Sequence, residues 1–174
     1  MKRILFVDGY NVLGAWDALR MGRKPAEARE ALCERLAAYA GYCRHPVVAV
    51  FDAWQSGRGK AARTLRGSLE IVYTGRGETA DAYIERRCHE YASRIASGEM
   101  QVTVATSDAM ERTIAAGRGA TCIGARELIG EIERSGKTVA ERMERPKRNA
   151  GTALADRLPE EIRSKLEAIA RGEK

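Results

Sequence analysis

The stretch Ile4-Leu5-Phe6-Val7-Asp8-Gly9-Tyr10-Asn11-Val12 decides the fold of this chain. Residues 4–7 are apolar and uncharged, which is typical of a strand buried on both faces of a parallel sheet. A carboxylate, Asp8, follows this strand at once, and Gly9 allows the backbone to turn. In open α/β sheets ligands bind outside the carboxyl ends of the strands. We therefore expect Asp8 at the mouth of a binding crevice, with Asn11 one turn further on.

The remainder of the chain alternates short apolar runs with amphipathic segments. Further strands are expected at residues 47–51, 69–73, 102–105 and, with a weaker pattern, 121–123. Helices are expected from Pro25 to residue 44 and at residues 78–97, 109–116 and 126–145. Such alternation predicts an α/β fold with a mostly parallel central sheet and helices on both faces.

The length of 174 residues suits one domain with a tail. We place the domain at residues 1–145. Residues 146–174 are expected to form a basic linker, at 146–151, and a C-terminal helix that begins near Leu158-Pro159. This last helix is expected to pack on the domain; binding to a partner is the alternative.

Composition excludes several classes of protein. The chain is 44% hydrophobic and 31% charged, with no membrane span and no secretory signal, so we expect it in the cytoplasm, or in an organelle after import. Its four cysteines are widely spaced and form no C-x-x-C pair. They are therefore expected to be reduced, buried residues and neither disulfides nor zinc ligands.

The charge balance favours a polyanionic partner. The net charge is +6 and the isoelectric point is about 9.3. Residues 55–66 are rich in glycine and cations without an apolar face, so we expect a mobile basic loop there. The candidate RNA-binding residues are Arg58, Lys60, Arg63, Arg66 and, in the next turn, Arg76. A merely solvated surface is the alternative for this loop.

Acidic residues gather where strands end. Asp8 and Asp52 directly follow strands, Asp108 comes three residues after one, and Glu78 and Asp81 open the helix that follows the third. In a parallel sheet all these positions fall on one edge, where uncompensated carboxylates would raise one another's pKa. Oxygen ligands without Cys or His suit a hard divalent cation, Mg²⁺ or Mn²⁺.

Each acid also has a simpler interpretation. Asp8 can close a turn, Asp52 can cap a helix or turn, and acids at a helix start favour its dipole. Asp108 with Glu111 fits a capping box. Asn11 can bond a carboxylate or phosphate, or cap its own turn. These interpretations do not explain why the acids coincide at one edge, and this coincidence favours a functional site.

Four motifs together resemble the YacP-like NYN-domain ribonucleases, a branch of the PIN-like nuclease superfamily. They are Asp8-Gly9-Tyr10-Asn11-Val12, Val50-Phe51-Asp52, Gly77-Glu78-Thr79-Ala80-Asp81 and Thr106-Ser107-Asp108. The resemblance covers about residues 1–170. It implies a PIN-like Rossmannoid three-layer sandwich and a metal-dependent endoribonuclease in which metal-activated water leaves a 5′-phosphate and a 3′-hydroxyl. It also implies association with the ribosome and cleavage of mRNA there.

The resemblance also assigns roles to residues of this sequence. It implies that Asp8, Asp81 and Asp108 bind the metal, Asp52 and Glu78 support them, and Asn11 orients the site. A non-catalytic module that binds RNA or the ribosome is the main alternative. Two other classes fit less well: aspartate phosphatases carry a second Asp where this chain has Tyr10, and a nucleotide cofactor would need a G-x-G-x-x-G run that is absent after the first strand.

Overall fold

The computed structural model describes residues 1–52 and 61–149, with side chains up to residue 141. The chain divides into two compact units, Met1–Gly136 and Lys137–Lys174. The sheet and its helices belong to the first unit. Within the described ranges no helix combines the length and apolar content that a bilayer span requires.

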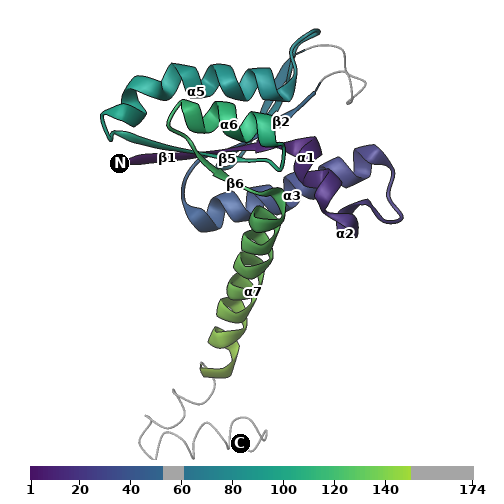
Figure 1. Cartoon of the computed structure of the whole chain (residues 1–174). Helices are drawn as coiled ribbons and strands as arrows, with labels where there is room; N and C mark the ends of the chain where they lie inside the picture. The colour runs from purple at the N-terminus through teal and green to yellow at the C-terminus, as the bar shows by residue number, and fades with distance from the viewer. Residues whose placement is uncertain (53–60, 150–174) are drawn as a thin grey trace, which may run out of the picture. The chain divides into compact units, whose positions relative to one another are not determined.

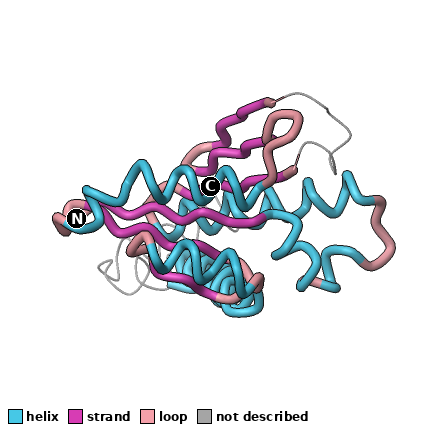
Figure 2. Tube along the Cα trace, turned by 45° about the horizontal axis from the view of Figure 1, so that its top comes forward, coloured by secondary structure: helices cyan, strands magenta, loops and turns pink. Residues whose placement is uncertain are grey.

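A sheet runs through the first unit, with its strands drawn in magenta in Figure 2. It has six strands in the order β3-β4-β2-β1-β5-β6. All neighbouring strands are parallel except β3 and β4, which are antiparallel. The strands are β1 (Lys2–Asp8), β2 (Val47–Phe51), β3 (Ala62–Arg66), β4 (Leu69–Tyr73), β5 (Met100–Ala105) and β6 (Thr121–Ile123). The expected mostly parallel sheet is therefore confirmed.

Helices cover both faces of this sheet (Figure 1). One face packs against α5 (Ala80–Ala96) and α6 (Ala109–Gly117). The other face packs against α1 (Gly9–Ala15), α3 (Pro25–Cys43) and the start of α7 (Ala125–Asn149), and the short α2 (Asp17–Arg20) follows α1. These are the three layers that the sequence predicts.

The alternation of side chains along β1 explains why an uncharged run is required there. Phe6 belongs to the core beneath α5, whereas Val7 belongs to the core beneath α3, and both are fully buried. Successive strand residues point to opposite faces of a sheet. A charge at either position would be buried without water, so the strand tolerates only apolar residues.

Residues 62–66 are a correction to the expected basic loop. They form the edge strand β3, in which Arg63 lies opposite Val72 of β4. An edge strand with a solvated face needs no alternating apolar pattern and is often charged, which hid it in the sequence. Leu65 is even 75% exposed. Residues 53–60, which include the candidates Arg58 and Lys60, lie outside the described residues.

The helix α7 is longer than expected. It ends at Asn149, so residues 146–149, expected to begin a linker, are helical. Lysine and arginine are good helix formers, and a basic composition therefore does not distinguish a linker from a helix. The predicted division at residue 145 remains a prediction, and the helix expected near Leu158 lies outside the described residues.

Candidate metal centre

The strand order predicts a binding crevice between the carboxyl ends of β1 and β5. From β1 the chain builds outward on one side through β2 and β4, and then on the other through β5 and β6. Ligand sites of open α/β sheets form where the strand order reverses in this way. Asn11 joins the two sides of the crevice, because its side-chain oxygen accepts a hydrogen bond of 2.8 Å from the backbone N–H of Ser107.

Asp8 ends β1 and caps α1. Its Oδ1 accepts a hydrogen bond of 3.1 Å from the backbone N–H of Asn11, so the simple turn interpretation is also true of this residue. The side chain is nevertheless only 9% exposed. Burial raises the pKa of Asp8 to about 6, and the charges of Asp81 and Asp52 act in the same direction.

Gly9 is required because α1 starts in contact with β2. A Cβ at this position would lie 2.2 Å from Cε1 of Phe51, whose ring is fully buried and stacks on Tyr73.

We expect Gly9→Ala to lower the free energy of unfolding by about 2 kcal/mol through overpacking, measured by urea denaturation. In the same helix Gly14 has open space around it, and Gly14→Ala should stabilise by roughly 0.5 kcal/mol. Equal effects of the two changes would contradict the close approach.

Asp52 positions the helix that carries Asp81. The carboxylate of Asp52, just after β2, accepts a hydrogen bond from the backbone N–H of Ala80, the first residue of α5. The hydroxyl of Thr79 caps the same turn by accepting from the N–H of Ala82 at 3.1 Å. Gly77, with a φ of +86°, makes the preceding turn. Asp81 is thereby fixed in the first turn of α5, beside Asp8.

Glu111 is the third acid of the site, and the sequence interpretation missed it. Asp108 does cap α6, since its Oδ1 accepts from the N–H groups of Met110 and Glu111 at 2.9 Å. A complete capping box would also return the Glu111 carboxylate to the N–H of Asp108. Here that N–H donates to the hydroxyl of Thr106 at 3.1 Å. Thr106, two residues before the cap, accepts the hydrogen bond that Glu111 would accept in a complete capping box. A threonine at this position is the feature of the sequence that could have indicated a different role for Glu111.

Asp8, Asp81 and Glu111 form the acidic triad of this structure. Each offers a carboxylate oxygen, and these oxygens all lie within 4.8 Å of one another. Glu111 is 5% exposed, and within the described part of the chain neither of its oxygens has a hydrogen-bond partner. No ion pair compensates the triad among those residues. Burial raises the pKa of Glu111 to about 8; the nearby Thr106 hydroxyl acts in the opposite direction, and the charges of Asp8, Asp81 and Asp108 add to the rise.

The acidic triad fits a divalent cation. Oxygens on opposite sides of Mg²⁺ lie about 4.2 Å apart, close to the span of these carboxylates. A cation would also supply the partner that the two buried oxygens of Glu111 lack. The absence of sulfur and imidazole from the triad favours Mg²⁺ or Mn²⁺ over zinc.

Two predicted acids do not join the triad. Asp108 is exposed and engaged as the α6 cap, although its charge still raises the pKa of Asp81, for which burial is the larger cause. Glu78 forms an ion pair of 2.9 Å with Arg86. Both lie next to the site by sequence, and their predicted roles as metal ligand and support remain predictions.

Two of the basic candidates in the described residues form ion pairs. Arg63 pairs with Glu70 at 3.6 Å, and Arg66 pairs with Glu30 on α3. The expected loop is wrong for these two residues, because they lie in the strand β3, and their candidate role in RNA binding remains a prediction. Arg76 is exposed in the turn before α5.

A groove between α5 and α6 leads away from the triad. It has a volume of about 460 Å³, and its lining includes Asp81, Asp108 and Glu111. Its lining also includes the apolar side chains of Ile114 and Met110 on α6, the latter 73% exposed. None of the described residues that line the groove is basic. The groove therefore suits a neutral, flat group better than a phosphate.

Comparison with known proteins settles the family. A family model described as "YacP-like NYN domain" matches residues 5–171. The chain belongs to the YacP-like NYN domain family. The Bacillus subtilis (strain 168) protein described as "Uncharacterized protein YacP" is 37% identical to this YacP-like chain over 144 residues, 82% of this chain and 79% of that protein.

Solved structures agree with this YacP-like NYN assignment. The crystal structure of a point mutant of Rae1 (YacP) from Bacillus subtilis superposes with a TM-score of 0.71 at 31% identity, covering 97% of this chain and 99% of that one. A second crystal structure of Rae1 (YacP) from Bacillus subtilis gives a TM-score of 0.66 at 30% identity, covering 98% and 95%. The resemblance and the α/β fold are thus confirmed. NYN domains are PIN-like nucleases, so the family supports a nuclease role related to RNA.

Proposed function

We propose that this protein is a divalent-metal-dependent endoribonuclease that hydrolyses phosphodiester bonds of single-stranded RNA. The observation that carries the proposal is Glu111, a buried carboxylate without a hydrogen-bond partner among the described residues, beside Asp8 and Asp81. An acid buried in this way costs stability unless a cation completes it. A pure RNA-binding surface would gain nothing from carboxylates that repel phosphate.

In this mechanism the protein supplies placement. Asp8, Asp81 and Glu111 would hold Mg²⁺ or Mn²⁺, while Asp52 fixes the start of α5 and Asn11 ties α1 to the turn after β5. The bound cation would lower the pKa of a water molecule and stabilise charge on the phosphate. The carboxylates, fixed by strand ends and helix starts, keep that centre in place without rearrangement.

The groove supports single-stranded RNA as the substrate. A nucleobase can pack against Ile114 and Met110 only when it is not stacked and paired within a duplex. Exposed Arg76 can contact the phosphate backbone nearby. We further propose that the RNA is mRNA presented on the ribosome, in the cytoplasm or an organelle. Family resemblance and the net charge of +6 support this part.

The test is cleavage of a 5′-labelled single-stranded RNA, with and without ribosomes, in Mn²⁺, in Mg²⁺ and in EDTA. We expect products with a 5′-phosphate and a 3′-hydroxyl that appear only with a metal, and Asp81→Asn should abolish them. Glu90→Gln, on the same helix and paired with arginines, is the matched control and should cleave normally. RNA binding without any product would instead favour the non-catalytic module, and equal cleavage in EDTA would exclude a metal centre.

A further inference from the structure

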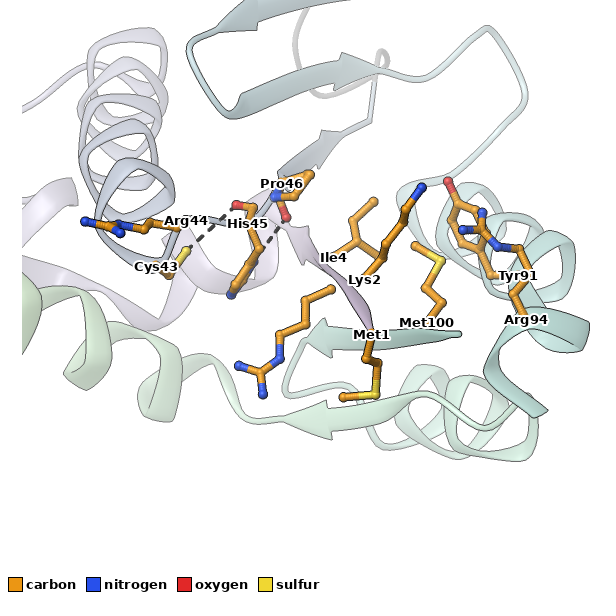
Figure 3. Close-up of a pocket in the computed structure, with 11 residues that line it drawn as sticks. Met1, Lys2, Ile4, Cys43, Arg44, His45, Pro46, Tyr91, Arg94 and Met100 are labelled. Carbon is orange, nitrogen blue, oxygen red and sulfur yellow. Dashed lines mark hydrogen bonds between the residues drawn. The ribbon is translucent and has the colours of Figure 1, made fainter. Parts of the chain in front are cut away.

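A second pocket lies at the end of the sheet where β1 begins, opposite to the carboxyl ends of the strands that carry the acidic triad (Figure 3). We call it the amino-edge pocket; it has a volume of about 650 Å³. The start of β1, the end of α3 and the last turns of α5 line it through Lys2, Arg3, Arg44, Tyr91 and Arg94. Because a strand rises about 3.3 Å per residue, the pocket is about 20 Å from Asp8.

The amino-edge pocket concentrates positive charge. Its described lining includes Lys2, Arg3, Arg44 and Arg94, and no carboxylate. Only Arg94 has a nearby acid, Glu99 at 3.7 Å, among the ion pairs of the described residues. Cations at the carboxyl ends of α3 and α5 suit the helix dipoles, but Lys2 and Arg3 on β1 have no such reason to be there. This charge pattern fits an anion.

Arg44 is held at a cost in backbone strain. It caps α3 with a φ of 56°, and it is the only non-glycine residue with positive φ that the described ranges contain. This left-handed position at a helix end is the one that glycine fills most easily. An arginine kept there indicates that its side chain has a use, since strained backbone gathers at functional positions.

The floor of the amino-edge pocket is apolar and aromatic. Ile4 and Met100 are buried beneath it, and Tyr91 stands at one side (Figure 3), with the guanidinium groups of Arg87 and Arg94 at 4.9 and 5.8 Å from its ring centroid. A basic rim beside an apolar floor suits unpaired nucleotides, with phosphates on the cations and a base against the apolar side chains. A simple inorganic anion would use the rim alone.

We infer that the amino-edge pocket is a second RNA-binding site, which holds a single-stranded segment of the substrate away from the cleaved bond. The identification of the anion as RNA rests on the proposed function, whereas the cationic pocket does not. Binding here requires no metal, because the carboxylates of the triad lie at the other edge. The same RNA chain could then contact the protein at both edges of the sheet.

The first test is RNA affinity in EDTA, measured by fluorescence anisotropy with a labelled single-stranded RNA. Arg3→Ala/Arg44→Ala should weaken binding about tenfold at low salt and reduce the slope of log affinity against log salt by about 1.4. The double variant Arg20→Ala/Arg35→Ala removes the same charge from exposed positions outside the pocket and should change affinity much less. Equal losses of RNA affinity in both double variants would overturn the inference. An unchanged RNA affinity in Arg3→Ala/Arg44→Ala would also overturn it, even if that variant lost affinity for anionic vesicles.

The second test separates binding from folding. Arg44→Gly relieves the left-handed strain, so its melting temperature should rise by about 2 °C while its RNA affinity falls. A purely structural role for Arg44 would leave the affinity unchanged, and this result would overturn the inference. Failure of the proposed function is distinct, because Asp81→Asn would then cleave normally whereas the pocket variants would still bind poorly.

Discussion

An Asp8→Asn variant should lose RNA cleavage by a factor of about 10³ or more while keeping its fold. Loss of a residue that only supports a metal ligand already costs about 10- to 100-fold, and a direct ligand should cost more. The amide retains an oxygen that can accept the N–H of Asn11, so the cap of α1 survives. Single-turnover cleavage at saturating Mn²⁺, with circular dichroism of the same sample, measures both properties.

Asp17→Asn is the control for this experiment. Asp17 also begins a helix and pairs with Arg20, but it lies exposed on α2, outside the acidic triad. It should cleave at the wild-type rate. Cleavage by Asp8→Asn within about threefold of that rate would remove Asp8 from the metal centre and the proposed mechanism with it.

Glu111→Gln should make the metal-free protein more stable and remove its response to metal. The buried carboxylate lacks a hydrogen-bond partner in the described structure, and an amide of the same shape carries no charge to desolvate. At pH 8 in EDTA we expect a melting temperature higher by about 5 °C. Mn²⁺ should stabilise the wild-type protein but not the variant, and cleavage should fall with the lost response.

The same residue sets an expected pH dependence. The pKa of Glu111 is raised from 4.5 to about 8, so the folded state keeps a proton that the unfolded state releases. In EDTA the contribution of Glu111 to the free energy of unfolding should therefore be fully present below about pH 4.5. This contribution should be lost as the pH rises toward 8. Asp8, with its pKa raised to about 6 mainly by burial, contributes with the same sign.

Thermal unfolding in EDTA across this range provides the measurement. Glu111→Gln should flatten the pH dependence, whereas Glu34→Gln, an exposed acid on α3, should leave it as in the wild-type protein. A wild-type stability that rises between pH 5 and 8 would contradict the buried, uncompensated acid. It would also remove the main support for a cation at this position.

Strands with uncharged runs could be predicted because burial on both faces admits no polar side chain. The strand at residues 69–73 was predicted with its observed bounds, and Pro25 was correctly placed as the first residue of α3. The edge strand β3 could not be predicted, because its exposed side chains are free to be charged. Only the assembled sheet shows that residues 62–66 pair with β4.

The sequence by itself determined the layered α/β fold, the family and the edge at which the acids gather, because each of these follows from burial or from residues close together in the chain. Tertiary structure alone decided which acids meet. Asp81 reaches Asp8 because Asp52, just after β2, anchors α5, and Glu111 joins them because Thr106 replaces it in the cap of α6. Both events depend on single hydrogen bonds between side chains and backbone, whose partners the order of residues leaves open. The amino-edge pocket arises in the same way, from β1, α3 and α5 meeting at one end of the sheet.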